Sequence, residues 1–410
     1  MLLVSCNNKL LNRRGLTFCL HPHLKFKIHH SLYLYSMLKP RAYQIPFYQL
    51  CWFFFPAWII TKLICYKLWL ADRIFPLVPV RFFSADLPNA FHLSLFVISM
   101  ACMIWMMVKP AKAIAALLLV VEIVSCLLDQ NRWQPWEYQF IFMLAAYVFS
   151  KEEKSVLAYW RMIMAALLFF SGFCKFNSAF IHDVWNHLIL HRWLHIQTGP
   201  EWLSRLGYLL PLIEMAAAIG LLFRKTVKYA VLILVAMHML ILLMFGPFGL
   251  NINSVIWPWN VLMLSLLLLL FFRTEPVFEQ TLLMRPFFWI VLMCWWILPW
   301  TRQSGYWDKY LSAVLYSGGV EQLFICSNNS EAKEATARFY EKQFRVIPCD
   351  SSIAAYYWGM KEMNTAPYPE RRVYKGIARK WRERFHDSTA RFYIFKPGFR
   401  IIVEELKEGK

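Results

Sequence analysis

The chain has 410 residues, of which 59% are hydrophobic, 18% aromatic and 17% charged. A typical soluble domain is ~45–50% apolar and ~25% charged, so this composition excludes an ordinary soluble enzyme and indicates an integral membrane protein. Ten scattered cysteines exclude a disulfide scaffold. The net charge of +19 is spread over short loops and the tail, which is typical of membrane orientation and argues against a nucleic-acid partner.

The N-terminal segment, residues 1–45, is basic and rich in histidine but holds no apolar run of span length. Met37 is an alternative start. Leu3 to Cys6 resembles a lipoprotein cleavage box, but almost no charged or apolar region precedes it. We therefore expect the membrane domain to occupy residues 46–300.

Apolar runs of ~20 residues, the length that crosses a bilayer core, recur through this domain. The run at 136–150 is short, although Pro135 suits a first helical turn. If that run were re-entrant, there would be eight spans and the tail would change sides. We expect nine transmembrane helices, near 50–70, 90–108, 111–128, 136–150, 156–175, 206–223, 228–246, 255–272 and 286–300.

Loop charge predicts the orientation, because cytoplasmic loops retain Lys and Arg. With the N-terminus inside, sixteen basic residues lie in the predicted cytoplasmic segments and six in the opposite loops. The expected fold is an all-α polytopic membrane bundle with a small C-terminal α+β domain, residues 301–410, outside the cytoplasm. The expected location is the inner membrane of a bacterium.

The tail alternates helix-like and strand-like stretches. Residues Glu331–Gln343 are charged and helix-like, whereas Arg391–Phe395 and Phe399–Val403 have the pattern of strands. Cys326 and Cys349 are the cysteines of the tail, and an oxidising compartment would permit a disulfide between them. Two free buried thiols are the alternative.

Charged residues inside apolar runs require a reason, because one at mid-bilayer costs roughly 2.5–3.5 kcal/mol. Lys67 is expected to snorkel to the interface. Glu122 and Glu214 would have to be paired or protonated, either in a structural hydrogen bond between helices or as functional acids. The charged set comprises Lys62, Lys67, Glu122, Asp129, Lys175 and Glu214.

Two polar segments next to these runs are candidates for binding. The segment from Asp129 to Tyr138 predicts a turn at the outer interface, in which Asp129 and Arg132 could pair. Trp133, Trp136 and Tyr138 would form an aromatic rim there. An anchoring role alone is the alternative.

The second polar segment carries histidines at i, i+4 spacing. His187, His191 and His195 would share one face of an α-helix, a geometry that could bind zinc. Against this, His, Trp and Arg are ordinary residues of a membrane interface. We therefore expect no metal site and interpret the segment as an amphipathic helix at the interface, with metal ligation as the alternative.

Several of these residues occur in the order of a known family. The set is Leu127-Leu128-Asp129, Trp133, Tyr138, Phe170-Ser171-Gly172-Phe173-Cys174-Lys175-Phe176, Trp193, Glu214, and His238 followed by Gly246-Pro247-Phe248. This order resembles the vitamin K-dependent gamma-glutamyl carboxylase superfamily, whose bacterial branch is the HTTM (horizontally transferred transmembrane) domain. The resemblance covers roughly residues 45–330, and the element Trp257-Pro258-Trp259-Asn260 is closer to the bacterial members.

The resemblance implies a mechanism. In the carboxylase, an intramembrane lysine at the end of a Gly-x-x-Lys element acts on a reduced quinone, whose oxygenation generates a base that removes a glutamate γ-proton before carbon dioxide adds. Lys175 matches that lysine. The tail is much shorter than the lumenal part of the carboxylase, so we expect an activity on a quinone or another lipid-soluble molecule rather than glutamate carboxylation.

Lys175 is therefore the predicted catalytic residue. A site of low dielectric, flanked by Phe173 and Phe176 and approached closely through Gly172, would make a neutral amine available as a base. Snorkelling, or neutralisation of Glu214, is the alternative role. The predicted substrate-binding residues are His238, Asn251, Asn253, Asn260, Glu214, Asp129 and Trp133.

Three functions are compatible with these features. The first is a membrane enzyme that acts on a quinone or lipid. The second is a non-catalytic scaffold whose outer domain recruits a periplasmic protein. The third is a redox-associated subunit, suggested by Cys102, Cys126 and Cys174, but buried cysteines usually behave as small hydrophobes and no Cys-x-x-Cys pair exists.

Overall fold

The computed structural model of the chain describes residues 46–80, 87–197, 199–272, 280–339, 347–349, 351–397 and 401–407. The N-terminal segment 1–45, including Met37, lies outside the described residues. Helices occupy every one of the nine apolar runs. By length and composition, five helical segments of the described chain could cross a membrane, which fits an integral membrane protein. The number of spans stays a prediction.

The helices end where the local sequence breaks them. The first apolar run divides at a turn at Cys65, and Pro135 and Pro286 open two helices at the first turn, where a missing N–H costs nothing. The bundle consists of α2 (Phe47–Ile64), α3 (Tyr66–Trp69), α4 (Asn89–Val108), α5 (Lys112–Leu128), α6 (Pro135–Phe149), α7 (Glu153–Lys175), α8 (Glu201–Arg205), η3 (Leu206–Tyr208), α9 (Leu209–Gly220), α10 (Val227–Phe245), α11 (Ile256–Phe271), α12 (Pro286–Leu292), η5 (Met293–Ile297) and η6 (Leu298–Ser304).

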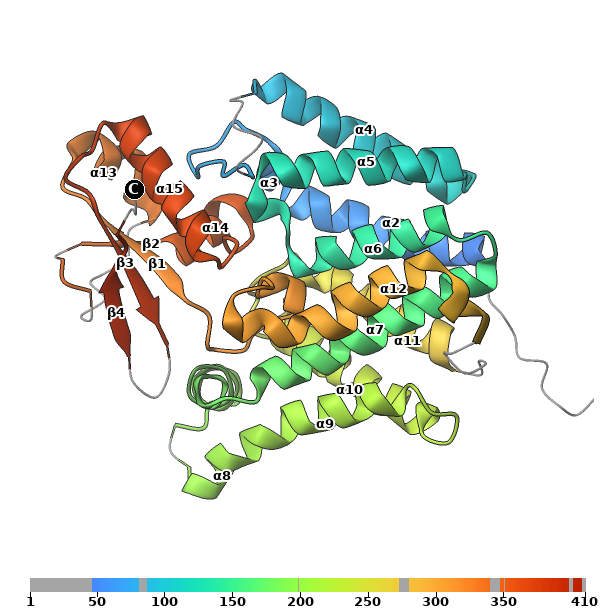
Figure 1. Ribbon diagram of the computed structural model, residues 1–410. Helices are drawn as coiled ribbons and strands as arrows, with labels where there is room; N and C mark the ends of the chain where they lie inside the picture. Colours follow the sequence, from blue (N-terminus) through green and yellow to red (C-terminus); the bar gives the residue numbers. More distant parts are fainter. Residues whose placement is uncertain are drawn as a thin grey trace, which may run out of the picture. The chain divides into compact units, whose positions relative to one another are not determined.

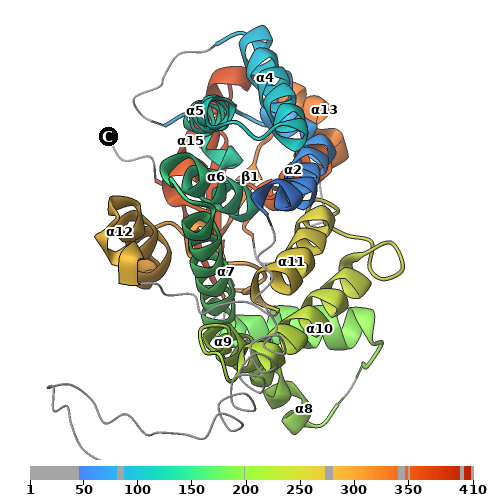
Figure 2. The same ribbon diagram turned by 90° about the vertical axis from the view of Figure 1, so that its right-hand side faces the viewer.

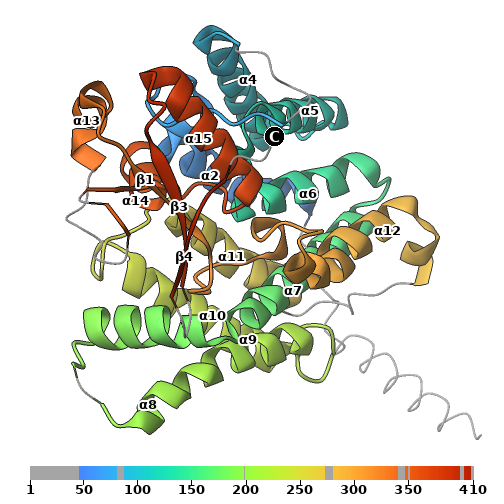
Figure 3. The ribbon, with the colours of Figure 1, turned by 60° about the vertical axis from the view of Figure 1, so that its left-hand side comes forward.

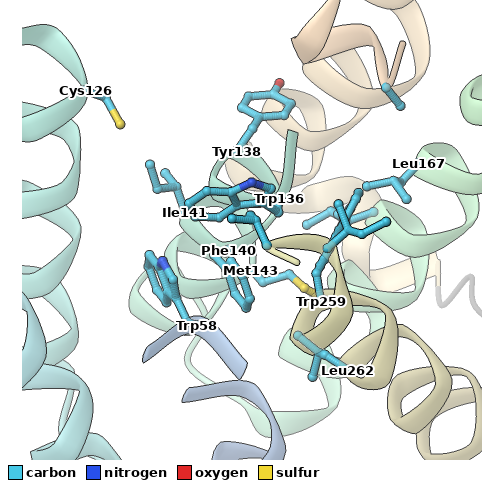
Figure 4. Packing of buried hydrophobic residues seen from close by; sticks show 14 of the residues in the cluster. Trp58, Cys126, Trp136, Tyr138, Phe140, Ile141, Met143, Leu167, Trp259 and Leu262 are labelled. Carbon is cyan, nitrogen blue, oxygen red and sulfur yellow. The ribbon is translucent and has the colours of Figure 1, made fainter. Parts of the chain in front are cut away.

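Helix α7 is the central element of the bundle (Figure 2). It packs against α6, α9, α11 and α12. In the most apolar stretch of α7, 89% of the residues are buried, against 28% in α4 and in α10. Helices α4 and α10 therefore present most of their apolar surface to the surroundings. The core beside α7 is aromatic, with Trp58 stacked on Phe140 at 4.8 Å between ring centroids and Trp259 beside Met143 (Figure 4).

Hydrogen bonds join loops that the predicted topology places on the same side. At one end, the Lys112 ammonium donates to the carbonyl of Ser150, and Arg285 pairs with Glu152 at 3.0 Å. At the other end, the amide of Asn177 donates to the carbonyl of Ser317, in the connection to the tail. These contacts agree with an alternating path of the chain between two ends.

The tail contains an antiparallel sheet of four strands in the order β2-β1-β3-β4. Strand β1 (Gln322–Cys326) pairs with β2 (Ile353–Ala354) and β3 (Arg391–Lys396), and β3 pairs with β4 (Ile402–Glu405). Helices α13 (Ser330–Thr336), α14 (Ala355–Met363) and α15 (Arg371–Phe385) accompany the sheet (Figures 1 and 3). The small antiparallel sheet with accompanying helices is thus present in the described part of the tail, and the division into domains stays a prediction.

The details of the tail differ from the sequence prediction in three places. The helix expected from Glu331 ends as α13 at Thr336, before a short 3-10 turn, and its last expected residues lie outside the described chain. Of the second predicted strand, Ile402 and Val403 belong to β4, which extends to Glu405, and Phe399 and Arg400 lie outside the described residues. Helix α15 was not predicted, although Val373, Ile377 and Trp381 recur at i, i+4 on its buried face.

The tail is fastened to two loops at one end of the bundle. The carboxylate of Glu362 accepts hydrogen bonds from the backbone N–H groups of Ile74 and Phe75, at 2.7 and 2.9 Å. The side chain of Asn131 accepts a hydrogen bond from the N–H of Tyr368 at 3.1 Å. Side chains of each part thus pair with backbone N–H groups of the other, which fixes the tail beside the Asp129 turn.

Candidate functional site

A cavity of about 290 Å³ lies at the tail-side end of α7, enclosed by α7, α9, α10, α11 and the helix η2 (Phe180–Trp193). Most of its lining consists of Leu, Ile, Val and Met side chains. Cavities that take small molecules are typically apolar with a few placed polar groups. The polar lining residues are Ser171, Lys175, Glu214, His238 and Asn260, and the aromatic ones are Phe180, Trp185, Trp193, Phe245, Trp259 and Tyr316.

Lys175 forms an ion pair in this cavity. Its ammonium group donates to a carboxylate oxygen of Glu214 at 2.7 Å and to the hydroxyl of Ser171 at 2.6 Å. The side chain of Lys175 is 14% exposed and that of Glu214 is 6% exposed. The expected neutralisation of Glu214 is therefore present. The expected flanking by phenylalanine is not, because Phe173 packs on Trp300 and Phe176 is largely exposed.

The ion pair depends on a close approach of α7 and α9. A Cβ atom added at Gly172 would lie 2.9 Å from the carbonyl oxygen of Pro211 and 2.8 Å from Cγ of Met215. Only glycine permits this spacing, which brings Glu214 on α9 opposite Lys175 on α7. The prediction that Gly172 lets another helix approach closely is confirmed.

His238 presents a hydrogen-bond acceptor to the cavity. Nδ2 of Asn260 donates to the carbonyl of Ile256 at 2.8 Å, which assigns the amide orientation and leaves its oxygen facing Nδ1 of His238, also at 2.8 Å. Nδ1 must therefore carry the proton, and Nε2 has a free lone pair. Nε2 is buried without a partner, so a ligand with a donor group would satisfy it.

The two remaining predicted asparagines lie at the edge of the site. The amide of Asn253 donates to the hydroxyl of Tyr316, whose side chain lines the cavity, so Asn253 contributes through that contact. Asn251 is exposed and is not among the lining residues. Both residues have positive φ, 49° and 51°, which Asn tolerates better than most side chains.

Asp129 and Trp133 lie away from this cavity. The Asp129 carboxylate is completely buried, pairs with Arg73, and accepts hydrogen bonds from the backbone of Val78 and from Asn131. The expected pairing with Arg132 is wrong, because that guanidinium donates to backbone carbonyls and contacts His92. These contacts give the Asp129 turn a structural role.

The aromatic residues of that turn do not form an exposed rim. Trp136 and Tyr138 are buried in the core, where Tyr138 stacks on Trp295 at 4.7 Å, and Trp133 is half-buried against the same cluster. These aromatic side chains were expected at the membrane interface, but they pack against segments that are distant in the sequence.

The histidine-rich segment forms the π-helix η2 rather than an α-helix. Its hydrogen bonds run i→i+5, so side chains about four to five positions apart share a face. Val184, Ile189 and Trp193 face the main cavity, whereas a polar hollow of about 470 Å³ is lined by His182, His187 and His191, among others.

This periodicity separates the three histidines that were expected on one face. His195 lies beyond the end of η2 in a left-handed conformation, while the rings of His187 and His191 stack at 5.6 Å. Among the residues with described coordinates, no group of three or more His, Cys, Asp or Glu side chains is arranged to hold a metal ion.

The cavity reaches the apolar surface of the bundle. Leu240 on α10 and Leu194 after η2 both line it, and their exposed fractions are 52% and 46%. A lipid-soluble molecule could therefore enter from the side, between apolar surfaces, without crossing the polar end of the bundle.

Trp259 and Tyr316 are lining residues that the sequence did not single out for binding. Trp259 belongs to a run of large apolar residues, and its position is fixed by a hydrogen bond to Gln139, 120 residues away. Tyr316 follows the bundle and has a positive φ of 48°. Neither position carries a local pattern that distinguishes a lining residue from a core residue.

Cys326 and Cys349 form a disulfide that ties β1 to the segment before β2. Cys102, Cys126 and Cys174 are free and buried.

Comparisons with protein-family models, with curated proteins and with solved structures found no match.

Proposed function

We propose that this membrane protein binds a lipid-soluble molecule in the α7 cavity and acts on it with Lys175, and that the natural ligand is a reduced quinone or a similar hydroxyl-bearing lipid. The observation that carries this proposal is one apolar cavity that holds the Lys175–Glu214 pair and the unpartnered Nε2 of His238. The resemblance to the vitamin K-dependent carboxylase and HTTM proteins is consistent with it.

The polar groups of the cavity suit a ligand hydroxyl. Nε2 of His238 accepts a hydrogen bond but donates none, so it favours a hydroxyl over a carbonyl oxygen. The ion pair supplies both a carboxylate that can accept a proton and an ammonium group beside it. Transfer of the hydroxyl proton to this pair would leave the ligand oxyanion next to the positive charge of Lys175.

This chemistry modifies the expected role of Lys175. In its observed contacts the ammonium group donates to Glu214 and Ser171, so a neutral amine forms only after a proton passes to Glu214. Lys175 and Glu214 therefore act together: Glu214 accepts the proton, and the ammonium group of Lys175 stabilises the negative charge that forms on the ligand oxygen.

Native mass spectrometry of the full-length protein, extracted in mild detergent, tests the proposal. We expect a stoichiometric lipid-soluble molecule on the wild type and its loss from the Lys175→Met variant, which keeps the length and apolarity of the side chain. Lys228→Met, which removes an exposed lysine of α10, is the matched control and should keep the ligand. Equal ligand content in folded wild type and Lys175→Met would contradict the proposal.

A scaffold is the second candidate function. Strand β4 is the last strand of the tail sheet, and Ile401 and Ile402 beside it are exposed by 55% and 50%. Open strand edges of this kind pair readily with another chain. A stoichiometric protein in place of a small molecule in the same mass spectra would favour this function.

We also propose that the tail lies outside the cytoplasm in a bacterial inner membrane. The charge bias of the loops and the expected odd number of spans support this orientation. Alkaline phosphatase fused after residue 305 should be active, because that reporter needs an oxidising compartment. Activity at that site from a cytoplasm-dependent reporter alone would reverse the orientation.

A further inference from the structure

A second group of charged side chains lies in the closed core of the bundle, apart from the cavity lining. Lys62 comes from α2, Glu122 from α5 and Glu137 from α6, and each is at most 1% exposed. Three separate helices thus bring two carboxyl groups and one ammonium group together in an apolar interior.

The two carboxyl groups have unequal partners. Glu122 accepts hydrogen bonds from the Lys62 ammonium and the Ser99 hydroxyl, one on each oxygen. Glu137 accepts one hydrogen bond, from Nε1 of Trp58 at 2.7 Å, and its other oxygen is buried without a partner. Trp58 links the two carboxyl groups, because its indole N–H binds Glu137 and its ring centroid lies 5.9 Å from Nζ of Lys62, the partner of Glu122.

In the described part of the chain, the cation that hydrogen-bonds to the carboxyl pair is the Lys62 ammonium. Cys65 on the α2–α3 turn and Cys126 on α5 are the adjacent titratable side chains. Lys62 lies 3.3 Å above the Trp69 ring, and Arg132, from the turn after α5, directs its guanidinium to the carbonyls of Leu68, Trp69 and Ser125.

A buried carboxylate without a counter-charge is strongly disfavoured, so it takes up a proton instead. One ammonium group balances one carboxylate, which leaves the second carboxyl group neutral. The unpartnered oxygen of Glu137 is the position from which a hydroxyl proton can be donated to Glu122.

We propose that Lys62, Glu122 and Glu137 form a membrane-embedded proton-binding site, in which one proton is shared between the two carboxyl groups at neutral pH. The site is independent of the proposed function, because none of its members lines the cavity. It gives the bundle one exchangeable proton in addition to the protons that the Lys175–Glu214 pair would exchange with a ligand.

Infrared spectroscopy of the purified full-length protein tests this site, because a protonated carboxyl group has a carbonyl-stretch band that a carboxylate lacks. We expect the band in the wild type, shifted in heavy water, and absent from Glu137→Gln. It should also be absent from Glu122→Gln, since the remaining carboxylate would then pair with Lys62. Lys62→Met should increase the band, because both carboxyl groups would hold protons.

Glu214→Gln is the matched control, as Glu214 already has its own lysine, and it should leave the band unchanged. A wild type without the band, or a folded Glu137→Gln variant that retains it, would overturn the proposal. If Glu137→Gln does not fold, the opposite changes expected for Glu122→Gln and Lys62→Met decide the matter. Loss of the band in Glu214→Gln alone would move the proton to the cavity and also overturn it.

Discussion

Two buried lysine–glutamate pairs occur in the same bundle, and their surroundings differ. Lys175 and Glu214 lie in a cavity that reaches the lipid-facing surface, beside an unpartnered histidine nitrogen. Lys62 and Glu122 lie in closed packing at 1% and 0% exposure, beside a second carboxyl group. The same residue types thus occur once with room for a ligand and once with room for a proton alone.

The difference shows that an intramembrane charge is not by itself a sign of a ligand site. What distinguishes the Lys175 pair is the cavity beside it, which the helix η2 helps to enclose. Around the Lys62 pair, Trp58, Trp69 and Phe140 fill the corresponding space. Exposure therefore separates the two roles better than residue type.

The largest effect is expected from removing the closed pair. Lys62→Met should lower the free energy of unfolding by ~3–5 kcal/mol, because Glu122 would lose its buried counter-charge. Thermal unfolding in detergent should show a clear fall in Tm, with ligand content per folded molecule unchanged. A variant as stable as the wild type would mean that the Lys62 pair is not an essential contact.

A smaller loss of stability but a complete loss of ligand is expected at the cavity. Lys175→Met should lower the free energy of unfolding by about 1–3 kcal/mol, since the Glu214 carboxylate loses one partner but stays next to accessible space. Parallel thermal unfolding and ligand measurements on the two Met variants check the contrast. A Lys175→Met variant less stable than Lys62→Met would contradict this difference between the two pairs.

Gly172→Ala tests the spacing that creates the cavity pair. The added methyl group would meet Pro211 and Met215, so we expect a cost of about 1 kcal/mol and weaker ligand binding as α9 moves from α7. Gly319→Ala is the control, because its nearest neighbour would be 3.8 Å away. Unaltered ligand affinity in Gly172→Ala would show that the spacing is not required.

The smallest effect on either pair is expected from the tail disulfide. Cys326→Ser should leave ligand content and the stability of the bundle unchanged, because the bond lies within the tail sheet. In the wild type, a gel-shift alkylation assay should find both thiols blocked until reductant is added. Two reactive thiols without reductant would contradict the bond and weaken the proposed outer location of the tail.

The sequence predicted the parts of the molecule that depend on local pattern. Apolar runs located all nine helical regions, and alternation located β3. Gly172 also predicted a close helix approach, and the pair with Glu214 was the alternative given for the role of Lys175. In each case the signal lies within a few residues or in a charge that needs compensation inside a membrane.

The rest depends on contacts between distant segments. Glu137 looked like an interfacial residue next to Pro135, and its partner Trp58 is 79 residues away. Asp129 was expected to bind substrate together with Lys175, but Arg73 and the backbone of Val78 hold it elsewhere. The sequence also did not reveal that η2 is a π-helix, in which the histidines lie on different faces than they would in an α-helix.

The central claim is that the α7 cavity binds a hydroxyl-bearing lipid-soluble molecule through His238 and the Lys175–Glu214 pair. Anaerobic titration of the full-length protein with menadiol and with its oxidised form menadione, followed by tryptophan fluorescence, tests it most directly. We predict that menadiol binds about tenfold more tightly, since one net hydrogen bond is worth about 1–1.5 kcal/mol, and that His238→Phe removes this preference. Equal affinities in the wild type, or a preference that survives His238→Phe, would contradict the claim.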